Sequence, residues 1–172
     1  MLINKKPLHP NFGVIIEDID LNQVSHNFLY KEIRELFENY SVILFKNQKI
    51  SDDTHINFAK LFGQLENREA MATNSDVEFE LSLVTNQKED KSVYDEYDIK
   101  TLDLKANMLW HTDSTFLPIP ALANIITAKI IPSSGGQTEL ASTRVALKKL
   151  PKDLYYKIKN KKIWHNLSHS RK

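Results

Sequence analysis

The sequence of 172 residues contains no cysteine and only four glycines. Without cysteine the chain cannot form disulfides, thiolate zinc sites, iron–sulfur clusters or cysteine nucleophiles, so a metal site would have to use His, Asp and Glu. The shortage of glycine argues against glycine-rich phosphate loops, and neither G-x-x-x-x-G-K nor G-x-G-x-x-G occurs in the sequence. Nucleotide binding therefore has no support in the sequence.

Net charge and long apolar runs are also missing. Lys plus Arg number 23 and Asp plus Glu number 22, which leaves a formal net charge of +1. This balance provides no overall field that would attract nucleic acid or an anionic membrane, so we expect neither as a partner. The N-terminal segment has no apolar signal-peptide core, and no run approaches the length of a membrane-spanning helix. A cytoplasmic protein is the resulting expectation.

What the sequence does contain is enough apolar material for a core, 41% of the residues. Apolar periodicity and end signals predict helices over residues 26–40 and 51–63, and two short helices over 143–162 that are separated at Pro151. Strand-like patterns cover residues 12–21, 41–47, 79–86 and 107–116, and 118–142 with a turn at 133–136. Residues 87–106 are rich in charge and predict a surface loop, either a solvated connection or a lid over a site.

These elements do not alternate regularly between strand and helix. The pattern therefore favours a mainly β or α+β antiparallel sandwich with flanking helices over a parallel α/β sheet. We expect residues 1–172 to form a single domain.

The run LWHTDSTF, residues 109–116, places His111 and Asp113 two positions apart. In a strand both side chains project from the same face, so we expect them to point together into the sandwich. An imidazole beside a carboxylate offers two ligands for a divalent metal, and a third ligand from a distant strand would complete the two-histidine, one-carboxylate site of non-haem iron. A structural hydrogen-bonded pair is the alternative, and zinc accepts the same ligands.

Longer stretches narrow the choice. The segments NMLWHTDSTF and PSSGGQTELAS, within residues 107–142, resemble the taurine dioxygenase and 2,4-dichlorophenoxyacetate dioxygenase family of Fe(II)- and 2-oxoglutarate-dependent enzymes. GVIIEDIDL (13–21) and YSVILFKNQKISDDTHINFAKLFGQLE (40–66) are similar to earlier family segments, in the same order. The resemblance implies a double-stranded β-helix, or jelly-roll, fold. It also implies an enzyme that uses Fe(II), 2-oxoglutarate and O2 to hydroxylate a small, often anionic, organic substrate, with release of succinate and CO2.

The resemblance also implies roles for individual residues. His111 and Asp113 would be iron ligands, and Thr138 would hydrogen-bond a carboxylate of 2-oxoglutarate. Asn107 would lie in the substrate pocket. Arg68 follows the helix that ends in Phe-Gly, in a region that contributes to the substrate pocket of relatives, and would bind an anionic group. An ordinary strand threonine and a solvated surface arginine are the alternatives for Thr138 and Arg68.

Other parts of the family pattern are not matched. The distal iron-binding histidine and the arginine that binds 2-oxoglutarate would lie beyond Lys172. We therefore expect the N-terminal part of a jelly-roll domain that is incomplete at its C-terminus, unstable or sticky, and of little activity alone. His165 and His169 are four apart, as paired zinc ligands on a helix are, or else have no metal role. The remaining histidines, His9, His26 and His55, are expected at the surface.

Several alternatives for function and partners stay open. A non-catalytic remnant or partner-binding fragment of the same fold is the main alternative to an oxygenase. A zinc hydrolase is less favoured, because no general base at a recognisable spacing accompanies the H-x-D pair. The expected partners are a small-molecule substrate and either a second copy of the chain or a separate C-terminal half.

Overall fold

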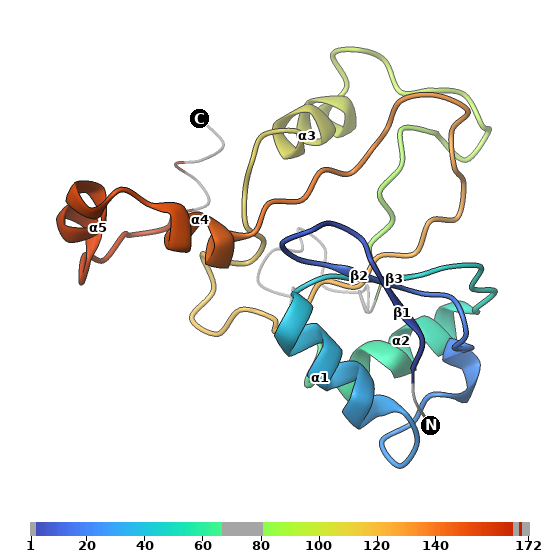
Figure 1. The fold of residues 1–172 in the computed structure, drawn as a ribbon. Coiled ribbons are helices and arrows are strands. Elements are labelled where there is room, and N and C mark those ends of the chain that lie inside the picture. Colours follow the sequence, from blue (N-terminus) through green and yellow to red (C-terminus); the bar gives the residue numbers. More distant parts are fainter. Residues whose placement is uncertain (1–2, 67–80, 167–168, 170–172) are drawn as a thin grey trace. The chain divides into compact units, whose positions relative to one another are not determined.

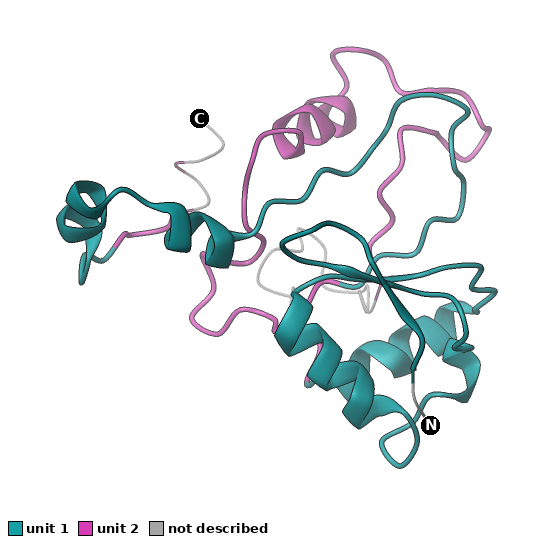
Figure 2. Cartoon of the chain, viewed as in Figure 1, with its two compact units in different colours: residues 1–63, 125–162 teal, residues 64–124, 163–172 magenta. Residues whose placement is uncertain are grey.

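The structure, a computed structural model, describes residues 3–66, 81–166 and 169. The chain divides into two compact units, which are coloured separately in Figure 2. Unit 1 comprises residues 1–63 and 125–162, and unit 2 comprises residues 64–124 and 163–172. Each unit is described by itself below.

Unit 1 contains a three-stranded sheet with the strand order β1-β2-β3 (Figure 1). Its strands are β1 (Lys5–Pro7), β2 (Val14–Ile16) and β3 (Ile43–Phe45). β1 runs antiparallel to β2, whereas β3 runs parallel to β2. A parallel neighbour requires a crossover connection, and helix α1 (Tyr30–Tyr40) provides it. The predicted strands over 12–21 and 41–47 are confirmed, although each is shorter than its pattern.

Helix α1 is amphipathic and buries Ile33 and Leu36 against the sheet side. It begins four residues later than the predicted 26–40, because Ser25 and Phe28 form a tight turn in which each backbone N–H donates to the other's carbonyl, both at 3.0 Å. A short 3-10 helix, η1 (Leu21–Gln23), precedes this turn. Of the apolar residues in the predicted segment 26–40, Leu29, Ile33 and Leu36 are buried, whereas Phe28 is exposed.

Helix α2 (Asp52–Leu61) confirms the prediction over 51–63, including Ser51 as the residue that caps its start. The Ser51 side chain accepts a hydrogen bond from the Thr54 N–H at 3.1 Å, which satisfies one of the free donors of the first turn. Gly63, which follows the helix, was expected to end it in the left-handed helical conformation; its φ of +139° favours glycine but lies outside that region.

The hydrophobic core of unit 1 lies where α1 and α2 pack on one face of the sheet (Figure 1). Phe58 of α2 contacts the rings of Phe45 and Phe62 edge to face, at centroid distances of 5.8 and 5.5 Å. Such tilted aromatic packing is favourable beyond the buried area alone. The buried members of the core are Ile16, Ile19, Leu21, Leu29, Ile33, Leu36 and Phe58.

Three further helices contribute no buried residue. α4 (Thr143–Lys149) and α5 (Lys152–Ile158) flank Pro151 and confirm the two short helices predicted there. α3 (Ile99–Asn107) corrects the prediction of a loop over 87–106. Its start is fixed by Asp98, whose carboxylate accepts the Lys100 N–H at 2.9 Å, a capping signal that the charge-rich composition of the segment obscured.

The predicted β-sandwich is not formed within the described residues. The strands expected over residues 81–86, 107–116 and 118–142 are absent there, while residues 79–80 lie outside the described part of the chain. Residues 108–117 use their backbone in local turns, such as the 3.0 Å bond from the Leu117 N–H to the Ser114 carbonyl. A strand needs a neighbouring ladder, and these segments have none in the described part of the chain.

Residues 122–128 keep one property of a strand. Their exposure alternates, with odd-numbered positions half-buried and even-numbered positions exposed, which is the two-residue period of extended backbone. The described helices include none long and apolar enough to cross a membrane.

Candidate metal centre

The two residues of the H-x-D motif face each other in unit 2. They follow the end of α3, in a stretch of bends and turns that leads into residue 117. His111 Nε2 lies 3.2 Å from Asp113 Oδ1. The predicted pairing of imidazole and carboxylate is therefore present in the structure, although not on a strand.

The tautomer of His111 follows from its second ring nitrogen. Nδ1 lies 2.6 Å from the backbone carbonyl of Leu109, and because a carbonyl can only accept, Nδ1 carries the hydrogen. Nε2 then offers either a second proton or a lone pair toward Asp113. A metal cation can take the place of that proton, and a histidine ligand held by an Nδ1–H to carbonyl bond is common in metal sites.

The spacing of the two atoms fits neighbouring positions of an octahedral site. Ligand atoms at right angles, with metal bonds of about 2.1–2.2 Å, lie about 3.0–3.1 Å apart. The observed 3.2 Å between Nε2 and Oδ1 is close to this value. A hard or borderline divalent cation accepts both nitrogen and oxygen donors, so the donor set fits Fe(II), Mn(II) and Zn(II) alike.

Neighbouring side chains of unit 2 hold the motif in place. Asn124 donates through Nδ2 to Asp113 Oδ2 at 2.6 Å. Ser114 is buried, has a φ of +59°, and donates its hydroxyl to the Glu66 carboxylate. The Thr115 hydroxyl lies 3.1 Å from His165 Nδ1. These contacts were not predicted; a lone Asn within the apolar run ALANII was the only sequence signal for any of them.

The expected orientation of the pair is wrong in one respect. The side chains of His111 and Asp113 are 47% and 52% exposed, so they do not point into an enclosed interior. The reason is the absence of the strand that would have turned them inward. Within residues 3–66, 81–166 and 169, no cluster of three His, Cys, Asp or Glu side chains is positioned to hold a metal ion.

Of the other three predicted site residues, one lies in helix α3, one in unit 1 and one outside the described residues. Asn107 is the exposed last residue of α3. Thr138 belongs to unit 1, in an exposed segment without regular secondary structure, after Gly135 and Gly136, whose positive φ values fit the predicted turn. Arg68 lies outside the described residues. The roles of all three remain predictions.

His55 corrects a sequence expectation. It was expected at the surface but is only 8% exposed. Its Nε2 lies 3.1 Å from the Ile125 carbonyl, and its Nδ1 lies 3.3 Å from the Thr127 hydroxyl. His55 therefore joins α2 to the extended segment within unit 1, which is a structural role.

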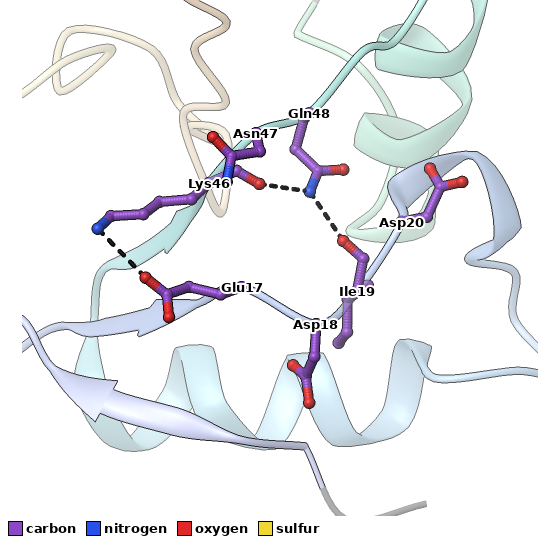
Figure 3. Close-up of a pocket in the computed structure, with 7 residues that line it drawn as sticks. All are labelled: Glu17, Asp18, Ile19, Asp20, Lys46, Asn47 and Gln48. Carbon is purple, nitrogen blue, oxygen red and sulfur yellow. Dashed lines mark hydrogen bonds and ion pairs between the residues drawn. The ribbon is translucent and has the colours of Figure 1, made fainter.

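A shallow hollow in unit 1, drawn in Figure 3, lies between the segment after β2 and the segment after β3. Several of its polar groups are paired with one another. The Gln48 amide donates to the carbonyls of Ile19 and Lys46 at 2.8 and 2.9 Å, and Glu17 pairs with Lys46 at 3.2 Å. This mutual pairing joins the segments that follow β2 and β3, which is typical of a structural contact. Its lining residues are Glu17, Asp18, Ile19, Asp20, Lys46, Asn47 and Gln48.

Comparison with known proteins decides the family. The family profile described as "Taurine catabolism dioxygenase TauD, TfdA family" matches residues 4–172. The chain belongs to the TauD/TfdA family. The resemblance stated from the sequence is therefore confirmed over nearly its whole length.

Relatives within this family are named as 2-oxoglutarate-dependent enzymes. The chain is 33% identical, over 99% of its length, to the alpha-ketoglutarate-dependent 2,4-dichlorophenoxyacetate dioxygenase of Cupriavidus pinatubonensis, and covers 61% of that protein. It is 30% identical, over 95% of its length, to the (S)-phenoxypropionate/alpha-ketoglutarate-dioxygenase of Sphingobium herbicidovorans, of which it covers 53%. The sequence thus spans a little over half of these family members.

A solved structure agrees with this assignment. The crystal structure of AAD-2 in complex with Mn(II) and N-oxalylglycine superposes with a TM-score of 0.84 at 27% identity. The alignment covers 99% of this TauD/TfdA chain and 61% of AAD-2.

Proposed function

We propose that this chain supplies part of the iron site of a 2-oxoglutarate-dependent dioxygenase that hydroxylates a small organic anion. The observation that carries the proposal is the convergence of His111 Nε2 and Asp113 Oδ1, 3.2 Å apart, in a chain that matches the TauD/TfdA family over residues 4–172. A cation bound by both atoms takes the place of the proton that Nε2 can carry, and the remaining positions around the cation are open to a cosubstrate and O2.

The chain's own residues have distinct tasks in this proposal. His111 binds the cation through the lone pair of Nε2, since the Leu109 carbonyl holds the single hydrogen of the neutral ring on Nδ1. Asp113 supplies a negative charge that offsets the charge of the cation. When bound, Fe(II) and 2-oxoglutarate supply the activation of O2, coupled to conversion of 2-oxoglutarate to succinate and CO2 and to hydroxylation of a substrate C–H bond.

The cosubstrate and substrate are assigned to three further residues. The hydroxyl of Thr138 donates a hydrogen bond to a carboxylate of 2-oxoglutarate. Asn107 and Arg68 face the substrate, Asn107 with a neutral amide and Arg68 with a guanidinium that matches an anionic group. AAD-2 binds N-oxalylglycine, which mimics 2-oxoglutarate and supports that choice of cosubstrate. A jelly-roll fold for the complete domain is part of the same proposal.

The names of the relatives support an anionic substrate. 2,4-Dichlorophenoxyacetate and (S)-phenoxypropionate are both small organic carboxylates. A related aryloxy-carboxylate is therefore the proposed substrate class for the whole protein. Exchanging Arg68 for Ala in a full-length relative should raise the substrate KM with less change in kcat, whereas an unchanged KM would remove Arg68 from the binding site.

A second candidate function is a non-catalytic or partner-binding role of the same fold. The half-exposed state of His111 and Asp113 favours it, since an enzyme that closes around its substrate expels water from the reacting groups. Both candidates are compatible with family membership, and metal binding separates them.

The deciding experiment is a titration of the purified chain with Mn(II) in the absence of oxygen, followed by electron paramagnetic resonance. We expect binding that is lost in His111→Ala and in Asp113→Ala and is unchanged in the exposed control His26→Ala. Equal binding by all four proteins would contradict the proposed iron site. With Fe(II), ascorbate and 2-oxoglutarate, succinate formation by the 172-residue chain should stay low, because the described residues bring no third His, Asp or Glu to the pair and two protein ligands hold a metal less well than three. Robust turnover would contradict that expectation.

A further inference from the structure

We propose that Asn124 is a positioning residue that fixes which oxygen of Asp113 is offered to the metal. This inference rests on the proposed role of His111 and Asp113 as metal ligands. Asn124 itself touches neither the metal position nor the cosubstrate in this proposal. Its effect is exerted through Asp113 alone.

The two oxygens of Asp113 have different partners. Oδ1 faces His111 Nε2 at 3.2 Å, whereas Oδ2 accepts a hydrogen bond from Asn124 Nδ2 at 2.6 Å. The amide orientation is fixed by chemistry, because an ionised carboxylate only accepts and Asn124 must therefore present its NH2 group. A hydrogen bond to a charged acceptor is short and stronger than one between neutral groups.

This arrangement determines how Asp113 can bind a cation. With Oδ2 held by the amide, Oδ1 is left beside His111 as a single ligand atom. Without the amide, the carboxylate can rotate about its terminal torsion, which has a broad and shallow energy profile, or can bind through both oxygens. A single-oxygen contact leaves one more position around the metal for other ligands, which a dioxygenase needs.

The local chain places Asn124 where this contact is possible. Within residues 122–128 the even-numbered side chains are exposed, and Asn124 is one of them. Its neighbours on that set, Leu122 and Ile126, are exposed and apolar, so the amide is a polar exception in an apolar row. The pairing with Asp113 gives this exception a physical reason.

Loss of such an outer partner of a metal ligand typically weakens metal binding about 10- to 100-fold. We expect Asn124→Leu, which preserves the size of the side chain but removes the donor, to weaken Mn(II) binding by about tenfold. The exposed Asn86 makes a matched control, because its backbone carbonyl bonds to the Tyr94 N–H and this bond survives in Asn86→Ala.

The test combines the Mn(II) titration with the side-chain amide signals of the full chain labelled with 15N-asparagine. Bound Mn(II) should broaden the Asn124 side-chain signal, since Nδ2 lies 2.6 Å from Asp113 Oδ2, and Asp113→Ala should both shift the Asn124 signal in metal-free protein and abolish its broadening. Circular dichroism verifies that Asn124→Leu is folded.

Two outcomes separate this inference from the proposed function. If Asp113→Ala abolishes Mn(II) binding but Asn124→Leu binds with the affinity of the original chain, the role of Asn124 is overturned and the metal pair stands. If Asp113→Ala binds Mn(II) as the original chain does, the metal pair fails and the role of Asn124 fails with it.

Discussion

His55 shows how a single side chain can connect two parts of the chain that are far apart in sequence. Its Nε2 meets a backbone carbonyl, so Nε2 carries the hydrogen, and its Nδ1 accepts from the hydroxyl of Thr127. Both ring nitrogens are thus satisfied in the neutral form. Nothing in the local pattern around His55 indicates these partners, because they lie about 70 residues away in the sequence.

Exchanging His55 for Ala should lower the free energy of unfolding of the chain by about 1–3 kcal/mol, since the Ile125 carbonyl loses its donor inside the protein. Urea denaturation measures the change. Thr127→Val should cost less, and the double variant should cost less than the sum of the two, because the Thr127 bond is lost only once. The exposed His26→Ala, which loses an edge-to-face contact with the Tyr30 ring, serves as a control and should change the free energy of unfolding less than His55→Ala. Strict additivity would show that the 3.3 Å contact contributes nothing.

The stability of the fold should depend on pH through the ionisation of Glu17. Hydrogen bonds from Lys6 and Lys46 lower its pKa below the ordinary value of 4.5, with the charges of both lysines acting in the same direction. Because the folded pKa is lower than the unfolded one, ionised Glu17 stabilises the fold above pH 4.5, and this contribution is lost as the pH falls through the folded pKa.

The Glu17→Gln variant should therefore be less stable than the original chain at neutral pH and equally stable in acid, below the folded pKa of Glu17. Added salt should narrow the difference at neutral pH, since the groups are exposed and screened. Glu35→Gln, on the exposed side of α1, is the control for loss of a charge. A Glu17→Gln deficit that persists unchanged in acid would show that shape, and not charge, is responsible.

At the scale of elements, local signals set the ends of helices. Ser51 before α2 and Ser142 before α4 both accept a hydrogen bond from a first-turn N–H. The two capped helices contribute differently to the core, because α2 buries Phe58 and α4 buries no residue. The same type of cap should therefore matter differently for the two helices.

Ser51→Ala should lower the unfolding free energy by about 1 kcal/mol, whereas Ser142→Ala should fray α4 without moving the main urea transition. Ser51→Asp should restore stability, because a carboxylate also accepts the Thr54 N–H and suits the positive end of the helix. Equal effects of the two alanine variants on the main transition would contradict the inferred difference between α2 and α4.

These differences explain what could be predicted from sequence. The helices over 51–63 and around Pro151 follow from caps and periodicity within each segment. Strands β2 and β3 follow from the short apolar, β-branched runs that they contain. The strand predicted around His111 depends on a ladder with other segments, which no local pattern can supply. The pairing of His111 with Asp113 was predictable from their spacing, but its half-exposed setting and the Asn124 contact were not.

At the scale of the whole molecule, the exposed apolar side chains set the behaviour of the isolated chain. Both tryptophans of the sequence are exposed, Trp110 by 68% and Trp164 by 91%. Further exposed apolar residues lie in residues 122–131, called here the extended segment, where Ile126 and Ile130 are 74% and 76% exposed. Apolar surface left in water favours association, and an extended segment without a ladder adds backbone groups that can pair.

Variants of the neighbours Ile125 and Ile126 can distinguish the effect of this segment on stability from its effect on association. Ile125 packs against the core of unit 1, so Ile125→Thr should lower the unfolding free energy by about 1–2 kcal/mol. Ile126 projects into solvent, so Ile126→Thr should leave the urea midpoint unchanged while reducing the fluorescence of bound anilinonaphthalene sulfonate and the concentration-dependent association seen in size-exclusion chromatography with light scattering. Threonine preserves branching at Cβ in both variants, so backbone preference is matched. If the dye signal and association of Ile126→Thr match those of the original chain, the extended segment is not the surface through which the chain self-associates.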